Sequence, residues 1–249
     1  MKIISTVPSI TELLADLGLH DETIGITKFC VHPRDWFKSK TRIGGTKTLD
    51  LEKIKTLQPS LIIANKEENV KEQIEALAED YEVLVTNIKS PEDNLNLITD
   101  LATKTGKRMT GIRLRAQLEA ALISLKPQRQ KTCAYLIWQN PYMIAGGDTY
   151  INATLAKCGF SNVYHHLNRY PEVTIEQLQE KNPEYILLSS EPFPFKQKQL
   201  DTIQLLLPKS KVLLVDGEAF SWYGTRLIKT VDYLSDLIKT TDTNPIINQ

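Results

Sequence analysis

Short runs of hydrophobic residues alternate along the chain with segments in which hydrophobic residues recur every three or four positions. The short runs are rich in Ile, Leu and Val, which is typical of strands buried on both faces of a parallel sheet. The spaced segments are typical of amphipathic helices. The alternation therefore predicts an α/β fold with parallel sheets. The predicted strands are Lys2–Val7, Thr23–Thr27, Ser60–Ala64, Glu82–Val85, Cys133–Trp138, Glu184–Ser189 and Lys211–Val215, and the predicted helices are Thr11–Gly18, Asp50–Leu57, Val70–Glu79, Glu92–Ala102, Tyr150–Cys158, Thr174–Lys181 and Leu227–Lys239.

Several predicted boundaries have specific chemistry. Ser9 precedes the first helical pattern, so we expect it to cap the helix and to form a capping box with Glu12. Gly18 and Gly159 are expected to follow the last turns of two helices as left-handed residues. The polar end of the chain, residues 240–249, is expected to fray.

The chain repeats part of its own pattern at about half its length. Segment 48–67, TLDLEKIKTLQPSLIIANKE, matches segment 172–191, EVTIEQLQEKNPEYILLSSE, so that Glu52 corresponds to Glu176. Each copy predicts a short helix, a proline turn, a buried strand and an acidic loop. Two copies predict two similar lobes, and small ligands usually bind in clefts between lobes.

A helical segment is expected to join the two lobes. Its hydrophobic stripe runs from Leu95 past Gly106 and Gly111, and each glycine costs a helix about 1 kcal/mol relative to alanine. We therefore expect either one long helix or two in sequence, and an ordinary surface helix within a single domain is the alternative. The predicted organisation is an N-terminal α/β lobe at residues 1–93, a helical connector at 94–126 and a C-terminal α/β lobe at 127–249.

Composition and charge exclude several classes of protein. The 30 basic residues balance the 30 acidic ones, so nothing predicts attraction to nucleic acid or to a membrane surface. The three cysteines, Cys30, Cys133 and Cys158, are too few for a disulfide framework or a zinc cluster, and Cys133 and Cys158 are expected in the core. No hydrophobic run approaches the ~20 residues that span a bilayer. The chain opens on a predicted strand rather than on a signal peptide, so we expect it to be either cytosolic or written without its export segment.

Six loops that follow predicted strands combine aromatic, acidic and turn residues. In α/β sheets, ligands collect beyond the C-terminal ends of the strands, and aromatic side chains in such loops suggest a flat or hydrophobic ligand. The alternative is that Phe193, Phe195 and Phe220 are folded under their loops as anchors. The candidate ligand-binding residues are Pro8, Phe29, His32, Asn65, Glu67, Trp138, Tyr142, Glu191, Glu218, Phe220, Trp222 and Tyr223.

The sequence gives little indication of catalysis. It contains no G-x-S-x-G elbow, no glycine-rich phosphate loop and no G-x-G-x-x-G after a strand. Cys30 and His32 are a poor nucleophile pair, because residues two apart in an extended loop point to opposite faces. No histidine pair has zinc-site spacing. Metal ligands thus stay undefined, with Cys30, His32 and His165 as candidates, although His165 also fits a simple polar turn. No catalytic residue or catalytic cofactor is assigned.

An ordered set of motifs extends over nearly the whole chain. It comprises VPSxTELLxxLGL at 7–19, GIT at 25–27, IGGTK at 43–47 and LEKIxxLxPxLIIA at 51–64 with the NKEEN loop that follows. Together with the internal duplication, this set resembles the substrate-binding proteins of ABC importers that have a helical backbone. That class includes binders of vitamin B12, ferric siderophores and haem, and its vitamin B12 binders resemble this chain most.

The resemblance implies two Rossmann-like lobes joined by one long helix, with the ligand in the cleft between them. It also implies a non-catalytic, monomeric protein outside the cytoplasm that docks on an ABC permease through one glutamate per lobe. The matching positions are Glu52 and Glu176, and the alternative is that both are ordinary carboxylates favoured by the helix dipole.

The implied ligand is a metal chelate, either a corrinoid or an iron chelate such as a siderophore. Pro8, Phe29, Glu218 and Phe220 are compatible with the site of the family, whereas Asn65 stands where an aromatic residue is usual. The acidic loops disfavour a polyanionic ferric catecholate and tolerate a corrinoid or a cationic chelate.

Two interpretations from other classes stay open. One is a metal-dependent or metal-cluster enzyme with two lobes, against which the small number of cysteines counts. The other is a cytosolic ligand sensor or scavenger, which the absence of a signal peptide suggests.

Overall fold

The structure, a computed structural model, describes residues 1–243 of the chain. Its backbone forms two compact units. The chain passes from one unit to the other several times, so each unit is built from discontinuous segments. The N-terminal unit comprises Met1–Ile88, Glu92–Glu119 and Tyr223–Arg226, and the C-terminal unit comprises Lys89–Pro91, Ala120–Trp222 and the chain from Leu227 onward.

The N-terminal unit contains a parallel five-stranded sheet. Its strands lie in the order β3 (Thr41–Arg42), β2 (Thr23–Ile26), β1 (Ile3–Ser5), β4 (Leu61–Asn65) and β5 (Val83–Thr86). Two neighbouring interior strands, β1 and β4, are buried along their whole length, as their uninterrupted hydrophobic runs predict. The helices are α1 (Pro8–Asp16), α2 (Arg34–Ser39), α3 (Leu51–Leu57), α4 (Lys71–Ala78), α5 (Pro91–Lys104) and α6 (Arg108–Ser124).

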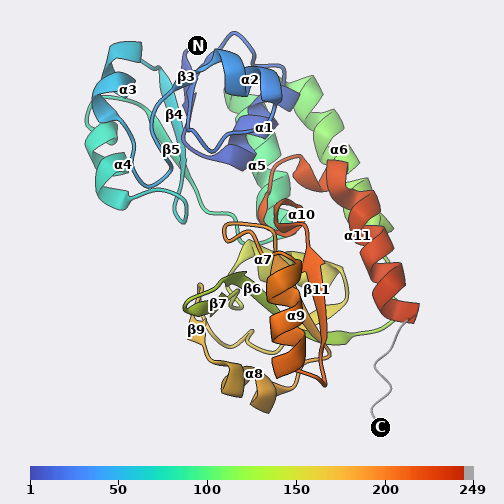
Figure 1. Cartoon of the computed structure of the whole chain (residues 1–249). Helices are drawn as coiled ribbons and strands as arrows, with labels where there is room; N and C mark the ends of the chain where they lie inside the picture. The colour runs from blue at the N-terminus through green and yellow to red at the C-terminus, as the bar shows by residue number, and fades with distance from the viewer. Residues whose placement is uncertain (244–249) are drawn as a thin grey trace. The chain divides into compact units, whose positions relative to one another are not determined.

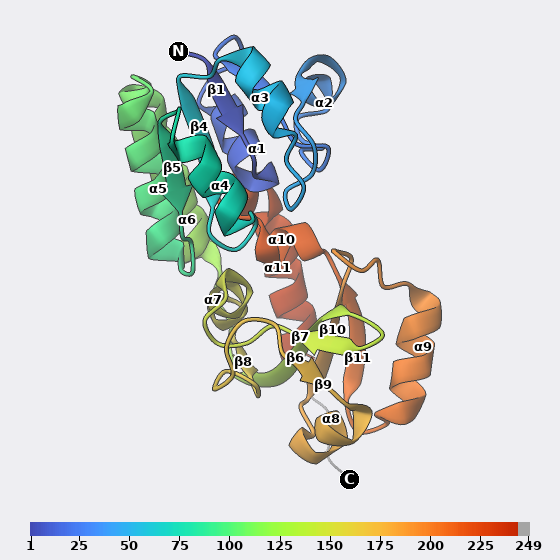
Figure 2. The same ribbon diagram turned by 90° about the vertical axis from the view of Figure 1, so that its left-hand side faces the viewer.

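Helices cover both faces of this sheet. Ile4, Ile62 and Ala64 share one face because side chains alternate along a strand, and there they pack with Ile54 of α3 and Leu77 of α4. Figure 2 shows α3 and α4 on that side and α5 with α6 on the other. The layered arrangement leaves the two ends of the strands as the open edges of the sheet.

The C-terminal unit contains a mixed six-stranded sheet. Strands β6, β8, β10 and β11 are parallel, whereas β7 runs antiparallel to β6 and to β9. The sequence predicts only parallel pairing, because short strands such as β7 and β9 give no hydrophobic run. The sheet order is β11 (Lys211–Val215), β10 (Tyr185–Ser189), β6 (Lys131–Trp138), β7 (Tyr142–Ile144) and β9 (Glu172–Val173), with β8 (Phe160–Asn162) paired to β6.

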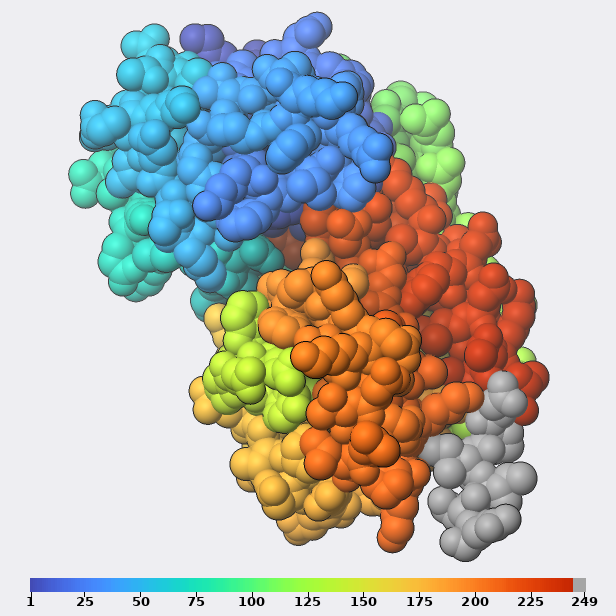
Figure 3. Space-filling model, viewed as in Figure 1, coloured from blue at the N-terminus to red at the C-terminus, as the bar shows by residue number. Residues whose placement is uncertain are grey.

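Helices pack on this second sheet too. On one face Leu136, Ile186 and Leu188 contact Leu178 of α8 and Ile203 of α9. Both helices are labelled in Figure 1, and α9, in orange, forms part of the outer surface of the unit in Figure 3. The helices of this unit are α7 (Tyr150–Lys157), α8 (Ile175–Lys181), α9 (Gln197–Leu206), α10 (Gly217–Ser221) and α11 (Arg226–Thr243).

The internal repeat is confirmed at the level of local structure. Glu52 and Glu176 are each the second residue of their helix, α3 and α8. Both helices end in a left-handed residue, Gln58 with φ 49° and Asn182 with φ 44°, directly before a proline. A buried strand then follows in each unit, as predicted.

Some predicted boundaries are confirmed and one is wrong. Gly18 and Gly159 have φ values of 77° and 78° just after α1 and α7, as expected. The capping box of Ser9 with Glu12 does not form, because α1 begins earlier: Val7 is its N-cap and Pro8 its first residue. Proline fixes a helical φ at the first position, so it starts the helix before Ser9.

The helical pattern between the halves forms two helices. α5 ends at Lys104, Gly106 adopts φ 72°, and α6 begins at Arg108. At the other end of the chain α11 continues to Thr243, so the predicted fraying does not begin at residue 240, and residues 244–249 lie outside the described part.

A segment from the far end of the sequence completes the N-terminal unit. The backbone N–H of Gly224 donates to Oδ1 of Asn94 at 2.6 Å, and Nδ2 of Asn94 donates to the Gly224 carbonyl at 3.2 Å. Gly224 has φ 79°, a conformation that glycine adopts without strain. Asn94 therefore holds the crossing chain at both of its backbone polar groups.

Charged side chains hold the next two residues of the same segment. Thr225 Oγ1 donates to the carboxylate of Asp16, and Arg226 Nη2 forms an ion pair with Glu12 Oε1 at 2.9 Å. Both side chains of that ion pair are almost fully buried. Residues Tyr223–Arg226, which we call the crossover segment, are thus an integral part of the N-terminal unit.

Candidate functional site

The predicted site residues lie mainly where parallel strands end. In the N-terminal unit the loops after β1, β2, β4 and β5 leave the sheet at one edge, since these strands run in the same direction. In the C-terminal unit the loops after β6, β10 and β11 do the same. We call these the N-terminal edge loops and the C-terminal edge loops, and α/β proteins collect ligands at such edges.

Asn69 organises the N-terminal edge loops. Its Oδ1 accepts hydrogen bonds from Thr6 Oγ1 and from the backbone N–H of Asn65, both at 2.8 Å. Its Nδ2 donates to the Thr46 carbonyl at 3.0 Å. One buried amide thus joins the loop after β1, the end of β4 and the turn before α3. Sequence reasoning did not single out Asn69, because a buried loop amide looks the same in sequence as an exposed one.

Asn65, a predicted ligand contact, supports the same loops. Its side chain is buried, with Oδ1 accepting from the N–H groups of Glu67 at 2.8 Å and Glu68 at 3.2 Å. Its Nδ2 donates to Thr86 Oγ1 at 3.1 Å. Asn65 therefore fixes the backbone that carries the two half-buried glutamates.

Phe29 is the most accessible aromatic candidate of the N-terminal edge loops. Its side chain is 51% exposed, and Lys28 Nζ lies 5.2 Å from the ring centroid. Pro8 is half-buried at the start of α1. Tyr223 is buried in this unit, and burial, reinforced by the Glu68 carboxylate, raises the pKa of its hydroxyl. The ring of Phe29 is thus offered to solvent, whereas Tyr223 is packed inside.

Cys30 and His32 occupy the loop after β2. The Cys30 thiol is fully buried, accepts a hydrogen bond from Thr11 Oγ1 at 3.0 Å and lies 3.2 Å from Thr27 Oγ1. Burial raises its pKa, so the thiol is held in its neutral form at neutral pH. His32 is half-buried beside it in sequence. A neutral, enclosed thiol is suited to a structural role in this loop.

An aromatic row crosses the C-terminal edge loops. Trp138, at the end of β6, is 40% exposed, and its ring meets that of Phe193 edge to face at 5.7 Å. Phe193 in turn meets the buried Phe195 at 4.8 Å. The backbone N–H of Phe193 donates to the Ile137 carbonyl at 3.3 Å, which ties the loop after β10 to the end of β6. Trp138 is therefore an exposed ring on a rigid support.

Glu191 connects the loop after β10 to α10. Its Oε1 accepts hydrogen bonds from Ser221 Oγ and from Trp222 Nε1, both at 2.8 Å. Burial raises the pKa of this carboxyl, the nearby Glu218 carboxylate adds to the effect, and the two hydrogen bonds oppose it. Trp222 itself is only 8% exposed.

The remaining ligand candidates of this unit differ in exposure. Phe220 is fully buried and packs on Tyr135 with ring centroids 5.3 Å apart, which fits the alternative of a loop anchor. Tyr142 is half-buried on β7 against the core. Glu218 is half-buried in the first turn of α10, a short helix where a loop was expected.

The metal candidates do not form a group of ligands. His165 is exposed in the turn after β8, with Nδ1 3.0 Å from the Asn162 carbonyl, and belongs to the C-terminal unit, whereas Cys30 and His32 belong to the other. Among residues 1–243 no three His, Cys, Asp or Glu side chains are grouped as a metal site requires. A cluster held by four thiolates would also need more cysteines than the three in the chain.

Comparison with known proteins identifies the family. The pattern that defines the family described as periplasmic binding protein matches residues 3–205. The chain belongs to the periplasmic binding protein family. The vitamin B12-binding protein of Vibrio vulnificus (strain CMCP6) is 27% identical over 194 residues, which cover 76% of this chain and 71% of that protein.

Solved structures show the same fold. The periplasmic vitamin B12 binding protein BtuF of Vibrio cholerae has a TM-score of 0.81 at 20% identity, covering 96% of both chains. The periplasmic heme binding protein HutB of Vibrio cholerae has a TM-score of 0.79 at 20% identity, covering 96% of this chain and 98% of that one. The predicted α/β fold with two lobes is thereby confirmed. Membership of a family of binding proteins also favours binding over catalysis as the function of the chain.

The two carboxylates that the repeat relates are both at the surface of their units. The Glu52 side chain is 86% exposed, with Lys55 Nζ 3.6 Å away one helical turn later. Glu176 is exposed in the first turn of α8, and a hydrogen bond with the Thr174 side chain lowers its pKa. Both groups are thus accessible to solvent.

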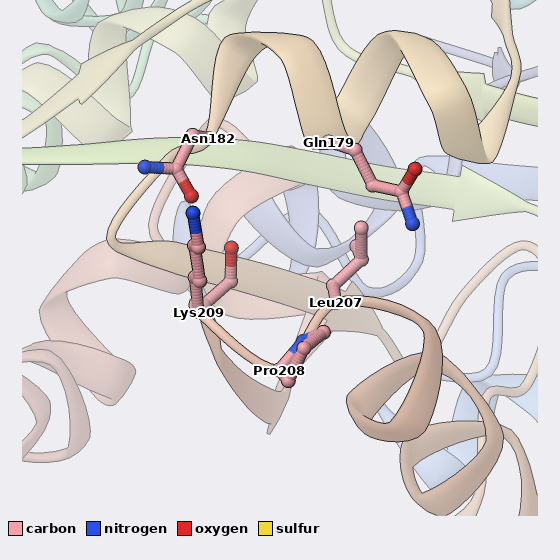
Figure 4. A pocket seen from close by; sticks show the side chains of 6 residues that line it. Gln179, Asn182, Leu207, Pro208 and Lys209 are labelled. Carbon is pink, nitrogen blue, oxygen red and sulfur yellow. The ribbon is translucent and has the colours of Figure 1, made fainter.

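Two pockets lie away from the edge loops. One, of about 230 Å³, lies where β10 and β11 begin and is therefore at the opposite end of the strands. Figure 4 shows the side chains that line it. The other, of about 300 Å³, lies between the end of α6 and α11. None of the candidate ligand residues lines either pocket. The residues that line the first are Gln179, Asn182, Leu207, Pro208, Lys209 and Ser210.

None of the helices within residues 1–243 combines the length and the hydrophobicity that crossing a membrane requires.

Proposed function

We propose that this chain is the solute-binding protein of an ABC importer and that its ligand is a metal chelate, either a corrinoid or an iron chelate. The observation that carries the proposal is the family match over residues 3–205. The relatives named for vitamin B12 and haem point to a macrocyclic metal complex as the kind of ligand. Such ligands have broad, flat and partly hydrophobic surfaces.

Two exposed rings are suited to contact such a surface. Phe29 stands in the N-terminal edge loops and Trp138 in the C-terminal edge loops, each on loops fixed by buried hydrogen bonds or ring contacts. Rigid aromatic side chains give large contact area and lose little conformational entropy on binding. We propose both residues as ligand contacts, together with Pro8 and Tyr142.

The charge of the edge loops restricts the ligand class. Glu67 and Glu68 lie in one set of loops and Glu191 and Glu218 in the other, all of them half-buried. Carboxylates partly removed from water repel an anionic ligand more strongly than fully solvated ones. We therefore expect a neutral or cationic chelate to bind more tightly than a polyanionic catecholate.

We further propose that Glu52 and Glu176 dock on the permease of the importer. Each is exposed, and each occupies the same position in its unit. Two carboxylates that meet two arginines would set the orientation of the complex and speed association, with little effect on folding. We propose that the protein acts on the outer side of the membrane as a monomer, without a nucleic acid partner.

A titration panel tests the proposal. Purified protein is mixed with cyanocobalamin, cobinamide, haem, a ferric hydroxamate and a ferric catecholate, and tryptophan quenching and calorimetry follow binding. We expect one neutral or cationic chelate to bind with a micromolar or lower Kd, and the catecholate to bind least. If none of these ligands binds at high micromolar concentration, the ligand class is wrong.

A further inference from the structure

The Glu191 carboxylate lies where two C-terminal edge loops meet. It follows β10, and its Oε1 receives hydrogen bonds at 2.8 Å from Ser221 Oγ, at the end of α10, and from Trp222 Nε1, just beyond it. Hydrogen bonds to an ionised acceptor are about twice as strong as those between neutral groups. One side chain thus connects two segments that are about 30 residues apart in the sequence.

Further contacts hold the start of α10 and the end of β10 close to this carboxylate. The Gly217 N–H donates to Ser190 Oγ at 2.9 Å, which brings the start of α10 against the same loop. A Cβ atom at Gly217 would lie 2.5 Å from Glu191 Cγ, so only glycine permits the Glu191 side chain to pack there. Tyr135 donates from its hydroxyl to Ser189 Oγ at 3.1 Å and so fixes the end of β10.

We propose that Glu191 is a positioning residue, whose carboxylate holds Trp222 and α10 against the loop after β10 and so presets the C-terminal edge loops for binding. The inference rests on the proposed function and differs from the sequence-based assignment of Glu191 as a ligand contact. Trp222 is nearly buried, so it acts mainly by supporting the exposed surface around it. Glu191 acts in turn through Trp222 and Ser221.

The electrostatic surroundings make this contact sensitive to pH. The groups that face Glu191 are the carboxylates of Glu218 and Asp216, from α10 and its N-cap, and the hydroxyl of Tyr135 from β6. Burial and the two carboxylates raise the pKa of Glu191, against the lowering effect of its two hydrogen bonds. Titration of Glu191 therefore changes the charge on the group that accepts the hydrogen bond of the Trp222 indole.

A ligand-free experiment tests the contact itself. The protein is labelled with 5-fluorotryptophan, and the three tryptophan resonances are assigned with Trp36→Phe, Trp138→Phe and Trp222→Phe. We expect the Trp222 resonance to shift with pH at a midpoint above 4.5, the ordinary value for Glu, and this shift to be absent in Glu191→Gln. A Trp222 resonance that titrates identically in the wild type and in Glu191→Gln would overturn the positioning role.

A binding experiment then tests whether the Glu191 contact affects ligand affinity. It uses the chelate that binds best in the panel. We expect Glu191→Ala to weaken binding by about tenfold or more, which is about 1.4 kcal/mol, because the loop after β10 and α10 lose the group that joins them. Glu191→Gln keeps an oxygen acceptor and should retain most of the affinity. Glu180→Ala, an exposed glutamate of α8, is the matched control.

The outcomes distinguish a failure of the positioning role of Glu191 from a failure of the proposed function. If Glu191→Gln is as harmful as Glu191→Ala, the charge contacts the ligand directly and the positioning role is wrong. If Glu191→Ala binds the chelate as tightly as the wild type does, the positioning role is also wrong. If the wild type binds no member of the panel, the proposed function fails, and the fluorine titration still decides whether Glu191 positions Trp222.

Discussion

Solvent exposure divides the aromatic residues that the sequence predicts at the site into two groups. The exposed rings can contact a ligand, and the buried rings support the loops. Phe29 and Trp138 present their rings to solvent, whereas Phe220, Trp222 and Tyr223 are buried. A buried ring in an edge loop stabilises the fold first and shapes the binding surface only through its neighbours. Substitutions of exposed rings should therefore affect mainly ligand affinity, and substitutions of buried rings mainly the stability of the fold.

Trp138→Ala and Phe220→Ala are the pair that shows this difference. We expect Trp138→Ala to weaken chelate binding by at least ~1 kcal/mol and to change the free energy of unfolding by less than about 1 kcal/mol, because the ring is 40% exposed and lies at the surface of the unit rather than in its core. Phe220→Ala should lower the free energy of unfolding by about 3–5 kcal/mol through the cavity that it leaves. Urea denaturation and calorimetry measure both quantities, and a strongly destabilised Trp138→Ala would contradict the assignment.

Glu191 should make the stability of the protein depend on pH. Its pKa is raised above 4.5, so the folded state holds the proton more tightly than the unfolded chain does. The stability that this contributes is present below about pH 4.5 and is lost as the pH rises through the folded pKa. Relative to Glu191→Gln, the wild type should thus become less stable as the pH rises from about 4.5 through the folded pKa of Glu191. If the free energy of unfolding has the same slope against pH in both proteins, the pKa of Glu191 is not raised in the folded state.

The sequence predicts the location of these residues better than their burial. Phe29 and Trp138 follow predicted strands, and that position alone brings them to the edge loops. Phe220 has the same kind of sequence context, yet its ring packs on Tyr135. The difference depends on contacts between segments far apart in the sequence, such as Asn69 with Thr6 or Glu191 with Trp222. No local pattern contains that information.

Among the helices and strands, local chemistry accounts for the predictions that succeeded. The buried strands β4 and β10 are uninterrupted hydrophobic runs, and the left-handed residue and proline after α3 and α8 end both helices sharply. α9 was not predicted, because its first turn, Gln197–Leu200, is mostly polar and few of its side chains are buried. The strands β7 and β9 were missed because they are two or three residues long.

The crossover segment should be essential for the stability of the N-terminal unit. Arg226→Met removes the guanidinium from the buried Glu12 carboxylate, and breaking a buried ion pair on one side costs about 3–5 kcal/mol. The double variant Glu12→Leu/Arg226→Met removes both charges and should recover most of that loss. Chemical denaturation measures the free energies.

The matched control is Lys239→Met, which breaks an exposed ion pair with Asp236 on the same helix, α11. Exposed pairs contribute about 0–1 kcal/mol, so this variant should remain close to the wild type. If Arg226→Met is no more destabilising than Lys239→Met, the crossover segment does not hold the unit together as we describe.

For the whole molecule, the repeat and the family match converge on transport. Two units with equivalent helices α3 and α8 each offer one exposed glutamate at the same helical position. A ligand-binding protein with two such points can be recognised by a permease in one orientation. The roles that we propose for the edge loops, in ligand binding, and for α3 and α8, in docking, can be tested separately.

The double variant Glu52→Ala/Glu176→Ala tests that separation. We expect the melting temperature and the chelate affinity to stay close to wild-type values, because both carboxylates are exposed and neither is among the candidate ligand contacts. Transport in vesicles or cells that contain the cognate permease should be lost. Glu75→Ala/Glu180→Ala, two other exposed helical glutamates, is the control and should transport normally. Transport by the Glu52/Glu176 variant at the wild-type rate would contradict the docking role.

Native mass spectrometry after incubation with an equimolar mixture of the chelate panel tests the central claim most directly. The account predicts a one-to-one complex whose added mass matches a single neutral or cationic metal chelate, and predicts that Phe29→Ala/Trp138→Ala reduces the population of this complex. Only the bare chain, even with every chelate at high micromolar concentration, would contradict the claim that the protein carries metal chelates for an importer.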